Sequence, residues 1–124
     1  MPIPYEQQFI EGILACLTNG VITIDSSDLI TTWNPAAGNI LRLEPSITLG
    51  KRYQDVFGSL PQLGLIGVLN TVRMQRSPGI VRTLVKGNVP ERGQVSLDLC
   101  IDVLVDSRLT YLGMVLVIND QTGR

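Results

Sequence analysis

The clearest pattern of apolar and polar positions lies between residues 94 and 106. Apolar side chains occupy alternate positions there, and Leu104 is the one large apolar residue among the more polar positions between them. A period of two places successive side chains on opposite faces of a strand. The segment therefore predicts an antiparallel strand with one buried and one solvated face.

Two further strands are predicted in the same third of the chain, at residues 80–86 and 109–119. A connection over 87–93, which contains Pro90, is expected to separate the first of them from the alternating strand. The segment 109–119 is apolar at nearly every position, which is typical of a strand with both faces covered. We therefore expect this last strand to lie in the centre of the sheet.

A β-hairpin is predicted near the start of the chain. The β-branched residues 21–24 form one short strand and residues 29–33 form another. The four residues between them, 25–28, are Asp, Ser, Ser and Asp, which favour turns. Two short strands across a tight polar turn predict an antiparallel pair.

Helical segments are predicted between this hairpin and the last three strands. Asn34 followed by Pro35 is typical of a helix start, because asparagine caps the first turn and proline loses no needed donor there. The helix is expected over 36–43 and is expected to end at Glu44, which precedes a proline. A second, shorter helical stretch is expected at 49–58.

The longest central helix is predicted over residues 60–75. Its apolar residues recur at helical spacing in the second half. Gly64 and Gly67 each destabilise a helix interior by about 1 kcal/mol relative to alanine. We therefore expect the first half of this segment to be irregular.

An amphipathic helix is predicted at the start of the chain, over residues 5–19. Its apolar stripe consists of Phe9, Ile10, Ile13, Leu14 and Leu17. Two interpretations remain open. The stripe docks on the core of its own domain, or part of it pairs with a second copy of the chain and forms a homodimer interface.

The order of these elements is helix, two strands, several helices and three strands. Such segregated runs predict an α+β fold with helices gathered on one face of an antiparallel sheet. The 124 residues suit one domain, and 44% hydrophobic against 17% charged residues exclude a disordered chain. The chain has no interior linker or repeat.

Missing residue types exclude several kinds of chemistry. The chain has no histidine, which removes the usual general base, the serine-protease type of triad, and histidine-ligated zinc or haem. Its two cysteines, Cys16 and Cys100, are too few for a zinc site and lack a histidine partner. We therefore expect no enzyme activity and no metal.

The net charge and the hydropathy of the chain limit the kinds of partner that it can bind. A net charge of −1 supplies no electrostatic surface for nucleic acid, and no apolar run approaches the ~20 residues that cross a membrane. No signal peptide precedes the cysteines, so we expect reduced thiols and a cytoplasmic location.

Two smaller clusters of charged residues are candidate sites of low specificity. Asp98 and Asp102 share the polar face of the alternating strand roughly 13 Å apart at the usual rise, too far for a glycosidase pair. We expect a solvated strand face there. Arg73 and Arg76 form a small basic spot at the end of the 60–75 helix, where they suit the helix dipole.

Several of these segments together resemble a PAS domain. Residues 19–25 (NGVITID) and 29–37 (LITTWNPAA), separated by three residues, resemble the opening of that family, and residues 49–51 and 56–57 resemble its next helix. The ending Asp120-Gln121-Thr122 is similar to the Asp-x-Thr motif that closes many PAS domains. The resemblance covers residues 8 to 124, with Asp28 where the family often has glycine.

The resemblance implies a five-stranded antiparallel sheet in the spatial order 2-1-5-4-3, with helices on one face and a flanking N-terminal helix. It implies one PAS domain over 1–124, with the N-terminal helix at 5–19, the PAS core at 20–119 and the start of an output linker at 120–124. The five strands and the central last strand that the apolar pattern predicts agree with this arrangement.

The resemblance also bears on cofactors and partners. Flavin-binding light sensors of the family carry an Asn-Cys-Arg-Phe box and haem-binding members use histidine, and the chain has neither. We therefore expect no cofactor, although an unidentified small ligand stays open. Members of the family dimerise through the N-terminal helix and regulate covalently linked histidine kinases, nucleotide cyclases or diguanylate cyclases.

Two functions follow. The first is a non-catalytic regulatory and dimerisation module of a bacterial signalling protein, which passes a signal through Asp120 and Thr122. The alternative is a small-molecule receptor with an occupied apolar pocket. Its lining would come from Ile24, Leu41, Tyr53, Phe57, Leu69, Leu97 and Leu99. Simple filling of the core by the same side chains is the competing interpretation.

Overall fold

The structure is a computed structural model that describes residues 18–75 and 79–123. The apolar stripe of the predicted first helix, Phe9, Ile10, Ile13, Leu14 and Leu17, lies outside the described residues, and so does Arg76. What the sequence predicts for these positions therefore stays a prediction.

The described residues form one sheet and a layer of short helices. The strands are β1 (Gly20–Asp25), β2 (Ile30–Trp33), β3 (Ile80–Val89), β4 (Gly93–Val105) and β5 (Tyr111–Asp120). The helices are α2 (Pro35–Leu41), α3 (Pro45–Thr48), α4 (Tyr53–Phe57), the 3₁₀ turn η1 (Pro61–Leu63) and α5 (Leu65–Gln75). The sheet order is β2-β1-β5-β4-β3 with all neighbours antiparallel, which confirms the expected α+β class and strand order.

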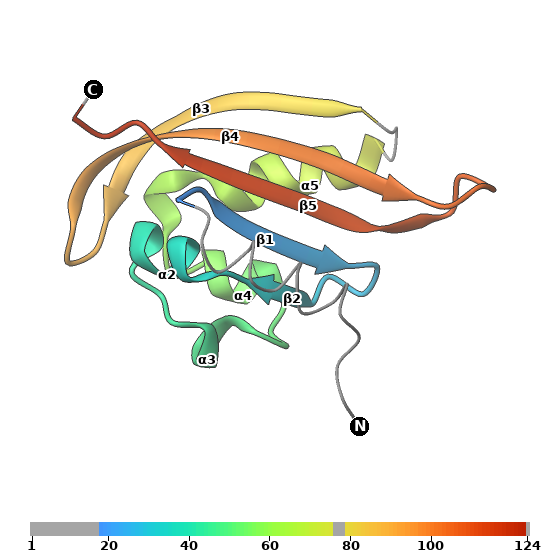
Figure 1. Ribbon diagram of the computed structural model, residues 1–124, viewed down its shortest axis with the longest axis horizontal. Coiled ribbons are helices and arrows are strands. Elements are labelled where there is room, and N and C mark those ends of the chain that lie inside the picture. Colours follow the sequence, from blue (N-terminus) through green and yellow to red (C-terminus); the bar gives the residue numbers. More distant parts are fainter. Residues whose placement is uncertain (1–17, 76–78, 124) are drawn as a thin grey trace.

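The helices cover one face of the sheet, as Figure 1 shows. The alternating strand is confirmed: its inward residues from Val95 to Val103 are at most 4% exposed, while Asp98 and Asp102 are partly exposed. Strand β5 is central, also as expected, but only its inner face is fully buried. Its outward residues Val115 and Val117 are half-buried, so the prediction that both faces are covered is only partly right.

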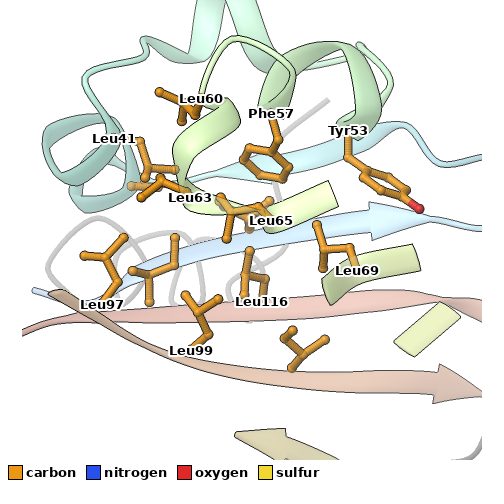
Figure 2. Packing of buried hydrophobic residues seen from close by; sticks show 14 of the residues in the cluster. Leu41, Tyr53, Phe57, Leu60, Leu63, Leu65, Leu69, Leu97, Leu99 and Leu116 are labelled. Carbon is orange, nitrogen blue, oxygen red and sulfur yellow. The ribbon is translucent and has the colours of Figure 1, made fainter. Parts of the chain in front are cut away.

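The layer between sheet and helices is a continuous apolar cluster (Figure 2). Helix α2 contributes Ala37 and Leu41, and α5 contributes Leu65 and Leu69, all at most 1% exposed. The indole of Trp33 lies at the edge of this layer, where its Nε1–H donates to the carbonyl of Leu43 at 2.9 Å. The polar atom of this large aromatic residue is therefore satisfied while its ring is buried.

Strand β3 is longer than predicted. It continues through residues 87–89, so the connection to β4 is a turn rather than a seven-residue loop. Gly87 falls in the predicted loop, but η1 crosses the strand at this point. A Cβ at Gly87 would lie 2.6 Å from the carbonyl oxygen of Gln62. Glycine here allows a close crossing of two backbones, which local sequence does not reveal.

The predicted central helix is divided, as its glycines indicate. Gly64 takes a left-handed φ of 67° and separates η1 from α5. Helix α2 ends earlier than predicted, because Arg42 takes the left-handed conformation with φ 58°. Pro45, which the sequence predicts only to follow the helix, begins the short helix α3 instead.

A polar cluster fixes the β1–β2 turn against the helices. Asp28, at φ 69°, is 8% exposed, and its carboxylate accepts from Arg73 Nε at 2.7 Å and from Gln54 Nε2 at 3.2 Å. Its backbone carbonyl accepts from the Tyr53 amide at 3.0 Å. The hydrogen bond to Asp28 raises the pKa of Arg73, whose guanidinium also lies 5.9 Å from the centre of the Tyr111 ring. The basic spot predicted at this helix end is therefore, at Arg73, an ion pair.

The close crossing at Gly87 predicts a large difference between two glycines. Gly87→Ala should lower the free energy of unfolding by about 1–3 kcal/mol, because the added methyl meets backbone rather than a movable side chain. Gly67→Ala is the matched control, since Gly67 has no atom within 4 Å of an added Cβ and lies inside α5. It should raise stability by up to about 1 kcal/mol. Urea denaturation measures both, and equal effects would contradict the crossing.

The partly buried Asp28–Arg73 ion pair predicts a second contrast in stability between two variants. Asp28→Asn keeps the shape of the side chain, and asparagine tolerates the left-handed backbone. The substitution should nevertheless lower the free energy of unfolding by about 1–3 kcal/mol, because Arg73 loses its charged partner. Asp98→Asn is the control, because Asp98 pairs with the 71% exposed Arg82 at 3.4 Å and should change stability by less than about 0.5 kcal/mol. Similar losses in both variants, measured by thermal or urea unfolding, would show that burial does not strengthen the Asp28–Arg73 pair.

Candidate functional site

The candidate site is the segment that follows the central strand. Past the end of β5, the Gln121 amide donates to the carbonyl of Ser96 at 2.8 Å. The Ser96 amide in turn donates to the Thr122 hydroxyl at 3.0 Å. The pairing of β5 with β4 thus continues beyond Asp120, so the segment 120–122 leaves the domain attached to the sheet.

Asp120 holds this segment in place with both carboxylate oxygens. Oδ1 accepts from the Thr122 amide at 2.9 Å, a contact that closes a tight turn within the Asp-x-Thr motif. Oδ2 accepts from an Nη of Arg92, which lies in the turn between β3 and β4. Strand β5 ends one residue later than the predicted strand 109–119, because Asp120 is its last residue.

Arg92 makes a second contact on the opposite side. Its other terminal nitrogen donates to the backbone carbonyl of Ile40 in α2 at 2.9 Å. Its side chain is only 17% exposed and that of Asp120 is 26% exposed. One guanidinium therefore joins the helix layer, the β3–β4 turn and the C-terminal segment.

The charge of Asp120 is stabilised in the folded protein. Partial burial disfavours the ionised carboxylate, but hydrogen bonds from the hydroxyl and amide of Thr122 and the contact with Arg92 outweigh it. Together they lower the pKa of Asp120 below its ordinary value. The carboxylate is consequently ionised at neutral pH, and the ion pair with Arg92 is formed.

The predicted pocket residues all come together in one buried apolar cluster. All seven of them, Ile24, Leu41, Tyr53, Phe57, Leu69, Leu97 and Leu99, belong to the buried cluster between sheet and helices and are at most 2% exposed. Six of the seven are labelled in Figure 2. Tyr53 is the one residue of the seven with a polar side-chain atom, and its hydroxyl donates to Asn70 Oδ1. Burial, followed by the charge of Asp28, raises the pKa of this tyrosine.

Several clefts open at the surface of the described part of the chain. One of about 300 Å³ lies beside α3 and α4 and is lined by Leu43, Ile47, Thr48, Lys51, Asp55, Val56 and Ser59. Two others flank the end of α2, and a fourth lies between α5 and β3. Leu41 is the one predicted pocket residue that lines any of these four clefts.

Metal-binding clusters and membrane-spanning helices are both absent from residues 18–75 and 79–123. No group of three or more cysteine, aspartate, glutamate or histidine side chains is placed to hold a metal ion there. In the same residues, no helix is long and apolar enough to cross a membrane.

Two members of the site are recognisable in the sequence and the third is not. Asp120 and Thr122 belong to the Asp-x-Thr motif, which is local in the chain. Arg92 lies 28 positions from Asp120, in a turn, and is one of ten basic residues in the chain. Only the folded arrangement shows which of these ten lies against the motif.

Comparison with known proteins identifies the fold. No model of a protein family and no curated protein matches the sequence. Among solved structures, the PAS domain of a protein from Colwellia psychrerythraea superposes with a TM-score of 0.71 at 10% identity, over 96% of this chain and 99% of that one.

Two other structures give the same result. An RNA-binding light-oxygen-voltage receptor superposes with a TM-score of 0.74 at 11% identity, over 97% of this chain, which spans only 34% of that receptor. The PAS domain of histidine kinase ThkA has a TM-score of 0.59 at 23% identity, over 82% of this chain and 98% of that one. The strand order, the single helical layer and these superpositions agree: the chain has the fold of a PAS domain.

Proposed function

We propose that the chain is a non-catalytic sensory and dimerisation module, which regulates a covalently linked output domain of the histidine kinase or nucleotide cyclase type. The observation that carries the proposal is the attachment of residues 120–122 to the sheet. The segment continues the central strand β5, and its side chains bind β4 and the β3–β4 turn. A displacement of the sheet therefore moves the point at which an output domain would be connected.

The PAS fold and the packing of the interior support this function over the alternative of a small-molecule receptor. Similar domains include one from a histidine kinase. The seven side chains that would line an internal pocket all belong to one buried apolar cluster. Few polar groups converge among them, whereas ligand sites usually combine apolar walls with several oriented polar groups. In this proposal the domain binds neither cofactor nor nucleic acid and works in the cytoplasm.

A fusion to a histidine kinase tests the signalling route. The chain replaces the kinase's own PAS domain, and autophosphorylation is measured for the parent and for Asp120→Asn. Losing the charge weakens both the Thr122 turn and the Arg92 contact, so activity should change by about fivefold or more, the lower part of the usual range for coupled sites. Asp98→Asn, a carboxylate on the solvated sheet face, should leave activity unchanged. A fusion in which Asp120→Asn is folded and behaves like the parent would contradict the route.

Dimerisation is tested on the predicted stripe. We expect the chain to be a homodimer in light scattering, because Phe9, Ile10, Ile13, Leu14 and Leu17 form a stripe wider than one helix contact needs. Replacing Ile10 and Leu17 together with glutamate should give a folded monomer, since charges cannot be buried unpaired at an isologous interface. A parent chain that stays monomeric at high concentration, or a double variant that stays dimeric, would overturn this part of the proposal.

A further inference from the structure

We propose that Arg92 is a positioning residue that couples the C-terminal end of helix α2 to the exit segment 120–122. A movement that starts at the end of α2 is then transmitted through Arg92 to the exit segment. The signalling meaning of the coupling rests on the proposed function, whereas the coupling itself is a property of this domain alone.

The end of α2 has a carbonyl that needs a donor. The last carbonyl groups of any helix lack partners within the helix, and α2 ends at once because Arg42 takes a left-handed conformation. The carbonyl of Ile40 receives its hydrogen bond from Arg92, across 52 positions in the sequence. A change at the end of α2 therefore acts directly on the Arg92 guanidinium.

The same guanidinium also binds the exit segment through Asp120. Its terminal nitrogens are fixed in one plane by delocalisation, so its contacts with Ile40 and Asp120 cannot move independently. Asp120 transfers the position of Arg92 to Thr122 through its second oxygen. Three hydrogen bonds thus connect α2 to Thr122, and the side chains of Arg92 and Asp120 are the two that link them.

Burial separates this ion pair from an ordinary surface pair. Arg92 and Asp120 are 17% and 26% exposed, whereas the Arg82–Asp98 pair on the open sheet face is 71% and 31% exposed with a longer separation of 3.4 Å. Partly buried charges are screened less by water and salt. Arg92 is therefore suited to hold a defined geometry rather than to contribute a loose surface attraction.

The joint between α2 and the β3–β4 turn lies beside two surface clefts. The clefts of about 540 Å³ and 240 Å³ that flank it share three lining residues, Arg42, Leu43 and Glu91. Arg42 ends α2 and Glu91 precedes Arg92 in the turn. Both clefts therefore lie beside the joint, next to the end of α2 and to Arg92.

The test follows the effect of Asp120 on α2 by NMR of the ¹⁵N-labelled chain. Asp120→Asn should shift the backbone amide signals of Leu41 and Arg42, because it releases one arm of the guanidinium that holds the Ile40 carbonyl. The same substitution in an Arg92→Gln background should leave those two signals where Arg92→Gln alone places them. This loss of the effect is the signature of coupling through a shared residue.

Two further variants separate position from charge. Arg92→Lys keeps a cation beside Asp120 but has a single nitrogen, so Asp120→Asn should lose its effect on α2 in this background although the domain stays folded. Arg82→Gln is the control, because it removes an exposed arginine that pairs with Asp98 rather than with Asp120, and it should leave the Leu41 and Arg42 amides unchanged. If Asp120→Asn does not shift α2 in the parent chain, or still shifts it without Arg92, the coupling is refuted.

The kinase fusion then distinguishes the two proposals. With the coupling established by NMR, Arg92→Gln should change autophosphorylation as Asp120→Asn does, and combining them should add no further change. If the NMR effect is present and none of these variants alters the kinase, the joint is real but the proposed signalling function fails. If the kinase responds to Asp120→Asn and not to Arg92→Gln, the movement that the exit segment reports does not begin at the end of α2, and that part of the inference fails on its own.

Discussion

The alternation of side chains along β4 and β5 creates the surface on which the rest of the domain is built. The inward residues of these two neighbouring strands form a continuous apolar layer, and α2, α4, η1 and α5 all contribute side chains to it. None of these helices has more than 11 residues, and isolated helices of this length are marginal in water. These helices are stabilised by packing on the sheet, so where they lie depends on the strands beneath them.

Polar contacts complete the structure at the two ends of this layer. Asp28 and Arg73 join the β1–β2 turn to α5 at one end, and Arg92 joins α2 to Asp120 at the other. The register of β1 with β5 places Asp25 opposite Gly113 and Gly20 opposite Ile118, so the two ion pairs lie at opposite ends of β5. Apolar packing alone is non-directional, and these contacts fix how the helices are oriented on the sheet.

Much of this arrangement was predictable because it depends on periodicity. The period of two in residues 94–106, the Asn34-Pro35 start and the apolar last strand each predicted an element that the structure contains. Two boundaries were wrong. Gly87 continues strand β3 at the point where η1 crosses it closely, and the left-handed conformation of Arg42 ends α2 two residues before the predicted end. The candidate site divides in the same way, since Asp120 and Thr122 form a local motif while Arg92 is brought to them only by folding.

The central position of the last strand also constrains how the chain reaches its native state. Strand β5 pairs with β1 on one side and β4 on the other, so Val21 finds its partner, Val117, 96 positions further along the chain. During synthesis, β1 and β2 can pair only with each other until residues 111–120 have emerged from the ribosome. Pairings of such long sequence separation slow folding, and a nascent or truncated chain exposes two unpaired strand edges that favour aggregation. The arrangement that attaches the exit segment to the sheet therefore also delays completion of the sheet until nearly the whole domain has been made.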